Sequence, residues 1–310
     1  MLRLPAAELS ALILALAALG PVRAAAGGAV ASGPGADPVP GTLHAVQNAD
    51  AVTRATRAAR PARGPALTRA LAAQHYRGPA FDACSAPALD TLRAWWGHSP
   101  YKAVGIYMGG ANRYCSQPRL NAAWVQGARA IGWRLIPVYV GSQAPCLNPK
   151  IKQRRIKAGQ ALAQGRTEAL DALRASDRLG LPGIAPLYLD MEAYRKNDPS
   201  CTATVQAFAA AWNRTVRAAG HLTGFYSSAD SGIRDLVRAA RAGRAGPADL
   251  PDVLWYAHWD QRDATVGEKA VPDADWQGAR IHQYKGNVRE THGGAALTID
   301  VNAVDAPVSR

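Results

Sequence analysis

Short apolar runs alternate with longer stretches of helical spacing along the chain from Gly78 onward. Buried strands that alternate with amphipathic helices are typical of a parallel sheet with helices on its outer side. The pattern predicts strands that end at Asp82 and Asp190, and others over Ala103–Tyr107, Arg134–Val140 and Gly224–Tyr226. It predicts helices over Ala88–Trp96, Leu120–Ile131, Ile156–Leu179, Thr204–Ala219 and Ile233–Ala242. These segments make five consecutive βα units.

The pattern loses its helices after the fifth unit. Gly- and Pro-containing loops join three further strand-like segments, Val253–Ala257, Arg280–Tyr284 and Leu297–Val301. Five βα units followed by three strands with few or no helices predict an α/β fold, a TIM-like β/α barrel with an incomplete helical jacket. The length of 310 residues suits one large domain, which we assign to residues 76–310.

The beginning of the chain differs from the rest in composition. A weak positive start at Arg3 precedes the apolar run Leu9–Leu19, and Ala24–Ala26 offers small residues for cleavage. This predicts a signal peptide over residues 1–26, with an apolar run too short to span a bilayer comfortably. Residues 27–75 are rich in Ala, Gly, Pro and Arg, which predicts a linker. We therefore expect a secreted, extracellular protein without a stable membrane span after cleavage.

The charge balance bears on the class of partner. The chain has 36 Lys and Arg residues against 23 Asp and Glu, a formal net charge of +13, which favours an anionic partner. No nucleic-acid motif accompanies the charge, so we expect no nucleic acid partner. The sequence contains no G-x-S-x-G, H-E-x-x-H or G-x-x-x-x-G-K-[ST]. This disfavours serine-hydrolase, zinc-protease and nucleotide chemistry, and we predict no cofactor.

Four cysteines indicate disulfides and no metal site. Cys84, Cys115, Cys146 and Cys201 are even in number and lack C-x-x-C spacing, which disfavours zinc or a redox pair. In an exported protein they predict two disulfides. Each follows one of four successive predicted strands, so neighbours in sequence could be neighbours in space. We predict Cys84 with Cys115 and Cys146 with Cys201, although four cysteines allow three pairings.

Two acidic residues, Asp190 and Glu192, end the fourth predicted strand with one residue between them. Residues i and i+2 of a strand point to the same face, so both carboxylates project together. Barrel enzymes keep their chemistry where strands open into loops, and paired carboxylates are the working groups of glycoside hydrolysis. The alternative is a solvated strand end or a salt-bridge partner.

Seven short motifs, in chain order, carry a resemblance to a known family. They are Phe81-Asp-Ala-Cys84, Tyr107-Met-Gly-Gly110, Tyr188-Leu-Asp-Met-Glu192, Gly224-Phe-Tyr-Ser227, Leu254-Trp-Tyr-Ala257, His282-Gln-Tyr284 and Ile299-Asp-Val-Asn302. From Phe81 to Asp305 the chain resembles the actinobacterial exported glycoside-hydrolase-like proteins, once catalogued as a domain of unknown function and similar to family 25 lysozymes. The resemblance implies a monomeric barrel, associated with the cell wall, that cleaves or binds a cell-wall polysaccharide.

The resemblance also implies roles for acids at the ends of strands one, four and eight. Glu192 would be the general acid, and Asp190 would stabilise the oxocarbenium-like state or orient a substrate N-acetyl group. Asp82 and Asp300 would act as base or as electrostatic partners. Crowded like charges would raise one pKa and so supply the acid. If Gly286–Ala296 closes a hairpin, the last strand is antiparallel and Asp300 lies at a different height in the barrel.

Aromatic and polar residues near the strand ends are candidate sugar contacts, because pyranose rings stack on aromatic faces. These candidates are Tyr107, Tyr139, Tyr188, Tyr226, Trp255, His258, Trp259 and Gln283. The alternative for each is packing in the barrel core or at its rim.

Three functions remain open at this point. The first is a secreted lysozyme-type glycoside hydrolase, and the second is a barrel that binds glycan without cutting it. The third is a purely structural exported domain. Convergence of Asp82, Asp190 and Glu192 in one open groove with aromatic walls and a raised pKa favours the hydrolase, whereas an arginine that fills the groove disfavours it.

Overall fold

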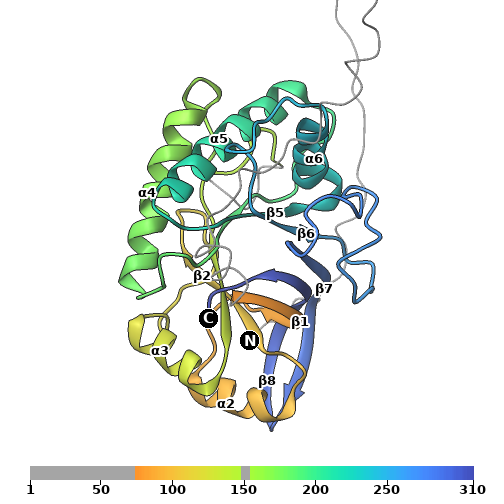
Figure 1. Ribbon diagram of the computed structural model, residues 1–310. Helices are drawn as coiled ribbons and strands as arrows, with labels where there is room; N and C mark the ends of the chain where they lie inside the picture. The colour runs from red at the N-terminus through yellow and green to blue at the C-terminus, as the bar shows by residue number, and fades with distance from the viewer. Residues whose placement is uncertain (1–73, 148–153) are drawn as a thin grey trace, which may run out of the picture. The chain divides into compact units, whose positions relative to one another are not determined.

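The structure, a computed structural model, describes residues 74–147 and 154–310. Eight strands in this part close into a barrel in chain order, from β1 to β8 (Figure 1). Strand β1 begins at His75, the last residue of the predicted linker. The predicted signal peptide over residues 1–26 and almost all of the linker over residues 27–75 lie outside the described residues.

The strands β1 to β7 run parallel, and β8 pairs antiparallel with both β7 and β1. Their bounds are β1 His75–Asp82, β2 Ala103–Gly109, β3 Arg134–Tyr139, β4 Leu187–Asp190, β5 Thr223–Ser228, β6 Val253–Ala257, β7 Arg280–His292 and β8 Ala295–Pro307. The closed sheet confirms the predicted TIM-like β/α barrel.

Each of the first five strands is followed by an α-helix. The helices are α2 Leu89–His98, α3 Ala122–Ile131, α4 Ala161–Arg178, α5 Pro199–Ala218 and α6 Arg234–Arg241. A short 3₁₀ segment, Ala158–Gln160, precedes α4, and a π-helical turn, Ala229–Ile233, precedes α6. In the described chain no helix lies between β6 and β7 or between β7 and β8. Five βα units followed by three bare strands are therefore confirmed.

Alternation along the strands decides which side chains face the inside of the barrel. On β4, Tyr188 belongs to the cluster inside the barrel, whereas Leu187 and Leu189 belong to the cluster between barrel and helices. The period of two puts Asp190 on the same face as Tyr188. On β1 the same rule places Asp82 on the inner face, because Phe81 packs in the outer cluster. The fold thus directs both carboxylates to the mouth of the barrel.

The last two strands form a hairpin that is longer than the sequence predicts. Gly293 and Gly294 make its turn, with φ angles of 55° and 78° that favour glycine. The ladder between β7 and β8 shifts register between Gln283 and Val288, and Asn287 there has a φ of 56°. The hairpin makes β8 antiparallel, and its pairing with β1 sets Asp300 directly opposite Asp82.

Both predicted disulfides are present. Cys84–Cys115 joins the segment after β1 to the β2–α3 loop, with Cα atoms 5.6 Å apart. Cys146–Cys201 joins the β3–α4 loop to α5, with Cα atoms 6.0 Å apart. Each pair links segments that follow neighbouring strands, β1 and β2 in one case and β3 and β4 in the other.

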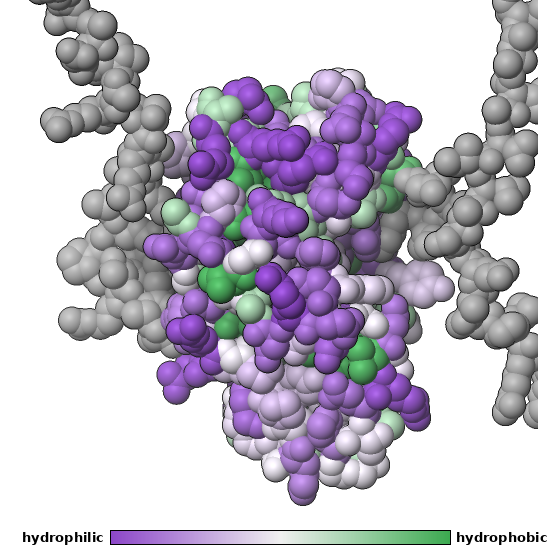
Figure 2. Space-filling view, turned by 90° about the vertical axis from the view of Figure 1, so that its right-hand side faces the viewer, coloured by the Kyte–Doolittle hydropathy of each residue, from purple (hydrophilic) through white to green (hydrophobic). Residues whose placement is uncertain are grey.

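The face of the molecule seen in Figure 2 is mainly polar. Figure 2 shows hydrophilic residues over most of one face, with hydrophobic residues in small separate patches. Within the part of the chain that the structure describes, no helix combines the length and apolar character needed to cross a bilayer.

Candidate active site

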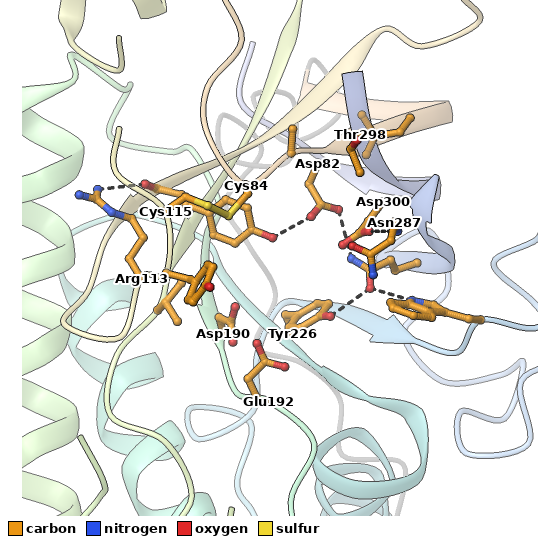
Figure 3. Close-up of a pocket in the computed structure, with 17 residues that line it drawn as sticks. Asp82, Cys84, Arg113, Cys115, Asp190, Glu192, Tyr226, Asn287, Thr298 and Asp300 are labelled. Carbon is orange, nitrogen blue, oxygen red and sulfur yellow. Dashed lines mark hydrogen bonds between the residues drawn. A yellow bond between two sulfur atoms is a disulfide. The ribbon is translucent and has the colours of Figure 1, made fainter. Parts of the chain in front are cut away.

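A cavity of about 350 Å³ opens at the ends of the strands (Figure 3). All four acids predicted from the sequence line it, together with residues from the loops after β1, β2 and β6 and from the hairpin. The lining residues are Asp82, Ala83, Cys84, Tyr107, Arg113, Tyr114, Cys115, Val140, Asp190, Glu192, Tyr226, Trp259, Gln283, Asn287, Thr298, Ile299 and Asp300. The acids form two sets by origin. We call them the buried pair (Asp82, which is buried, and the half-buried Asp300 opposite it) and the β4 pair (Asp190 and Glu192).

Asp82 is held by three donors in the interior. Its side chain accepts hydrogen bonds from the Tyr107 hydroxyl at 2.7 Å, from Gln283 Nε2 at 3.2 Å and from Asn302 Nδ2 at 2.8 Å. Opposite Asp82 on β2 lies Gly105, where a Cβ atom would come within 2.5 Å of the Asp82 Cβ. A residue without a side chain is therefore needed there to make room for Asp82.

Burial and, after it, the Asp300 charge raise the pKa of Asp82 to about 7, against the three hydrogen bonds that lower it. Burial likewise raises the pKa of Asp300, with a contribution from the Glu192 charge. The Asn287 backbone N–H, which donates to Asp300 Oδ1 at 2.6 Å, opposes that rise. Because the two carboxyls face each other across β1 and β8, the buried pair loses its protons at higher pH than isolated carboxyls do.

The β4 pair is positioned mainly through its backbone. Gln143, fully buried after β3, donates from Nε2 to the Asp190 carbonyl at 2.9 Å and accepts at Oε1 from the Glu192 N–H at 2.8 Å. The Met191 N–H donates to the Tyr226 carbonyl at 2.9 Å. Asp190 is buried and Glu192 half-buried. In Figure 3 both side chains point toward the space below the buried pair.

Gln283 links two aromatic side chains of the cavity, Tyr226 and Trp259, to the buried pair. Its Oε1 accepts from the Tyr226 hydroxyl at 3.0 Å and from Trp259 Nε1 at 3.1 Å, while its Nε2 donates to Asp82. Burial raises the pKa of Tyr107 and Tyr226 well above the usual range, so both hydroxyls keep their protons as donors. The structure therefore brings four of the eight predicted sugar contacts to the cavity: Tyr107, Tyr226, Trp259 and Gln283.

The other four predicted sugar contacts do not line the cavity, and this corrects the prediction for them. Tyr139 lies on the outer face of β3 and donates to Asp171 on α4 at 2.8 Å. Tyr188 and Trp255 face inward but are completely covered in the barrel core. His258 turns away and contacts Glu268 Oε2 through Nδ1 at 2.7 Å.

Three residues in or beside the cavity were not predicted as site residues. Gln143 and Asn302 act through hydrogen bonds between segments far apart in the chain, so their roles could not be inferred from local spacing. Asn302 also accepts from Trp255 Nε1 at 2.8 Å, which gives that buried ring an indirect link to Asp82. Tyr114 could have been predicted, because it lies beside Cys115 in the loop that follows β2.

An arginine lines the cavity without occupying its acidic centre. Arg113 Nη1 donates to the Tyr107 carbonyl at 3.2 Å, and Figure 3 shows its guanidinium turned away from the four carboxyls. Within the described residues, no group of three or more His, Cys, Asp or Glu side chains is arranged to hold a metal ion. Because the Arg113 guanidinium is turned away, the four carboxyls give the cavity an acidic centre.

Comparison with known proteins identifies one matching family. The family described as "Rv2525c-like, glycoside hydrolase-like domain" matches residues 93–304, more than half of the chain. The match includes the β4 pair and Asp300, and Asp82 precedes it. No curated protein sequence matches the chain significantly.

Several solved structures are similar to the chain. An uncharacterized B. stearothermophilus protein is 18% identical, with 73% of this chain and 95% of that chain covered and a TM-score of 0.48. The Mycobacterium tuberculosis Tat-secreted protein Rv2525c, in complex with L-tartrate, is 15% identical over 74% and 96%, with a TM-score of 0.48. The catalytic domain of endolysin ply40 from the Listeria monocytogenes bacteriophage P40 is 14% identical over 74% and 94%, with a TM-score of 0.44.

Proposed function

This chain belongs to the family of Rv2525c-like glycoside hydrolase-like domains, and on that basis we propose that it is an exported protein that binds and cleaves a cell-wall glycan in the carboxylate cavity. The observation that carries the proposal is the convergence of four carboxyls from three strands in one open cavity that Tyr226 and Trp259 also line. Glycoside hydrolysis needs one carboxyl that donates a proton and another that is ionised.

Glu192 is the proposed general acid. Its half-buried side chain reaches the cavity, and Gln143 fixes the backbone that carries it. It would donate its proton to the oxygen of the leaving sugar while Asp190, beside it, stabilises positive charge on the reacting ring. Asp82, when ionised, would add negative charge beneath the same ring. The buried pair would then hold one proton, on Asp300.

Export is part of the proposal. Two disulfides within one domain suit an oxidising compartment, since cytosolic thiols are kept reduced. The signal-peptide pattern at residues 1–26 agrees with this, and the cell-wall polysaccharide is the partner that the family resemblance implies.

A second candidate is a barrel that binds glycan without cutting it. The hydrogen bonds of the buried pair favour it, because Asp82 and Asp300 are already held by the protein's own donors. Such a barrel would keep its affinity for glycan after loss of Glu192 and would release no new sugar ends.

The test is the release of reducing ends from purified peptidoglycan by the mature protein. Glu192→Gln should lower the rate about 100-fold or more, the scale of a lost general acid, and Asp190→Asn should also lower it. Asp177→Asn, which alters an exposed carboxylate on α4 outside the cavity, is the matched control and should keep the wild-type rate. Retention on peptidoglycan without release by the wild type would favour the binding barrel.

A further inference from the structure

Two strongly exposed aromatic side chains line the cavity. Tyr114 is 78% exposed and Trp259 is 53% exposed. Three other large apolar side chains with high exposure in the described residues, Leu162, Leu170 and Val266, do not line it. Apolar aromatic surface in contact with water is unfavourable, and a ligand that covers it removes this contact. The two rings are therefore candidates for ligand contact.

The barrel topology places the two rings on opposite walls. Tyr114 lies in the loop that follows β2, and Trp259 follows β6. In a closed ring of eight strands in chain order, β2 and β6 are four places apart and therefore face each other across the mouth. The carboxyls of the buried pair and the β4 pair lie around the same mouth, at the ends of β1 and β4 and within β8.

Trp259 is fixed as a platform. Its indole N–H donates to Gln283 Oε1 at 3.1 Å, and its ring packs on the backbone of Gly286, where a Cβ atom would come within 2.0 Å of it. One face of the ring is therefore occupied by the hairpin. The exposed part is available to a ligand in the cavity.

The Tyr114 loop is fastened to the segment that follows Asp82. Cys115 is bonded to Cys84, and both half-cystines line the cavity. Ser85 Oγ donates to the Ser116 carbonyl at 2.8 Å, beside the disulfide. Gln117 adds two more hydrogen bonds, to the Cys84 carbonyl at 2.7 Å and from the Ala86 N–H at 2.9 Å. An exposed tyrosine is thus carried on a tightly held loop.

We propose that Tyr114 and Trp259 form an aromatic pair that grips the sugar rings of a glycan strand at the mouth, and that the Cys84–Cys115 disulfide positions Tyr114 for this contact. The inference rests on the proposed function, because it assumes a glycan ligand. Pyranose rings expose apolar C–H faces that stack on aromatic rings. Because Asp82 has three donors of its own, the disulfide acts on binding through Tyr114 and leaves the buried pair in place.

The first test is calorimetric titration with a soluble hexamer of β-1,4-linked N-acetylglucosamine, in a Glu192→Gln background that prevents turnover. Tyr114→Ala and Trp259→Ala should each raise the Kd about five- to tenfold, as expected for a lost stacking contact. Tyr114→Phe keeps the ring and should stay within about twofold of the background. Leu162→Ala, an equally exposed apolar residue on α4, is the control and should leave the Kd unchanged.

The second test is a double-mutant cycle between the ring and the disulfide. Cys84→Ser/Cys115→Ser should raise the Kd, and Tyr114→Ala should have little further effect in that background. Gln117→Ala, which removes two loop hydrogen bonds and keeps the disulfide, provides a second route if the double serine variant does not fold. Gln117→Ala should also raise the Kd.

The outcomes separate this inference from the proposed function. If the background protein binds the hexamer and Tyr114→Ala leaves the Kd unchanged, the aromatic pair is wrong whether or not the wild type cleaves glycan. If the effects of Tyr114→Ala and of disulfide loss add fully, the positioning role of the disulfide is wrong. Absence of hexamer binding in the background protein overturns the inference, while failure of the wild type to release reducing ends bears only on hydrolysis.

Discussion

The buried pair and the β4 pair are carboxyls of one cavity that the fold holds in different ways. Asp82 and Asp300 face each other across antiparallel strands; side-chain donors hold the buried Asp82, and a backbone donor holds the half-buried Asp300. Asp190 and Glu192 follow a parallel strand, and Gln143 holds their backbone while their side chains face the cavity. Burial and neighbouring charges thus raise the pKa values of the buried pair. The hydrogen bonds to the backbone decide where the side chains of the β4 pair lie. We infer that the buried pair sets the charge of the cavity and the β4 pair acts on the glycan.

Among variants that keep all four carboxyls, the largest effect on activity is expected from loss of the glutamine that holds the β4 pair. Gln143→Ala removes both hydrogen bonds to that backbone, and we expect kcat for glycan cleavage to fall about 10- to 100-fold through misplacement of Glu192. Gln206→Ala on α5, which removes one glutamine contact to the Asp235 carbonyl far from the cavity, is the matched control. If the two variants are equally folded and equally active, Gln143 does not position Glu192 for the reaction.

The second prediction concerns stability and pH. In the folded protein the pKa of Asp82 is raised to about 7. Between its unfolded pKa and that value the folded state binds the proton more tightly, so wild-type stability should fall as pH rises from about 4 to 7. Asp82→Asn removes the titrating group and should lessen this fall by about 2–4 kcal/mol.

The measurement is the free energy of unfolding in urea at several pH values. The exposed Asp177→Asn should follow the wild type. Parallel curves for wild type and Asp82→Asn would show that Asp82 titrates in its ordinary range.

A smaller effect is expected from the neighbour of Asp82 on β8. The hydrogen bond from Asn302 lowers the pKa of Asp82, so Asn302→Ala should raise that pKa further and move the pH dependence of activity to higher pH. At pH 8 the rate should change by less than about tenfold, since Tyr107 and Gln283 still donate to Asp82. An unchanged pH profile with lowered stability would leave Asn302 a purely structural role.

The smallest effect distinguishes two tyrosines at strand ends. Tyr139→Phe removes a hydroxyl that bonds Asp171 on the outer side of the barrel, and we expect a stability loss of about 0.5–1.5 kcal/mol with activity within twofold of wild type. Tyr107→Phe removes a donor to Asp82 and should shift the pH profile of activity. A shift in the Tyr139→Phe profile would contradict the placement of that ring outside the site.

These two tyrosines also show where sequence reasoning reaches its limit. The strand and helix pattern and the β4 pair could be predicted, because period and strand ends are local. The family resemblance supplied Asp82 and Asp300, and the order of the strands supplied the disulfide pairing. Which face a strand-end aromatic occupies depends on a shift of one residue, and that shift reverses the side chain. Tyr139 was assigned to the cavity for this reason, although it packs against Trp212 of α5.

The hairpin was underestimated for a related reason. The outer half of β7 alternates partly buried and exposed residues and is rich in polar ones, so it has little hydrophobic signal. Its pairing with β8 depends on backbone hydrogen bonds and on contacts such as Trp95 Nε1 with the Ala295 carbonyl at 2.9 Å. Gln143 and Asn302 escaped prediction because their partners lie far away in sequence and only the closed barrel brings them together.

The most direct test of the division between the two pairs is the pH dependence of kcat/KM for release of reducing ends from peptidoglycan, in wild type, Asp82→Asn and Glu192→Gln. The wild-type pH profile should have a limb near pH 7, set by the ionisation of Asp82. Asp82→Asn should lack this limb, and Glu192→Gln should be low at every pH. A limb near pH 7 that persists in Asp82→Asn, or full activity in Glu192→Gln, would contradict the account.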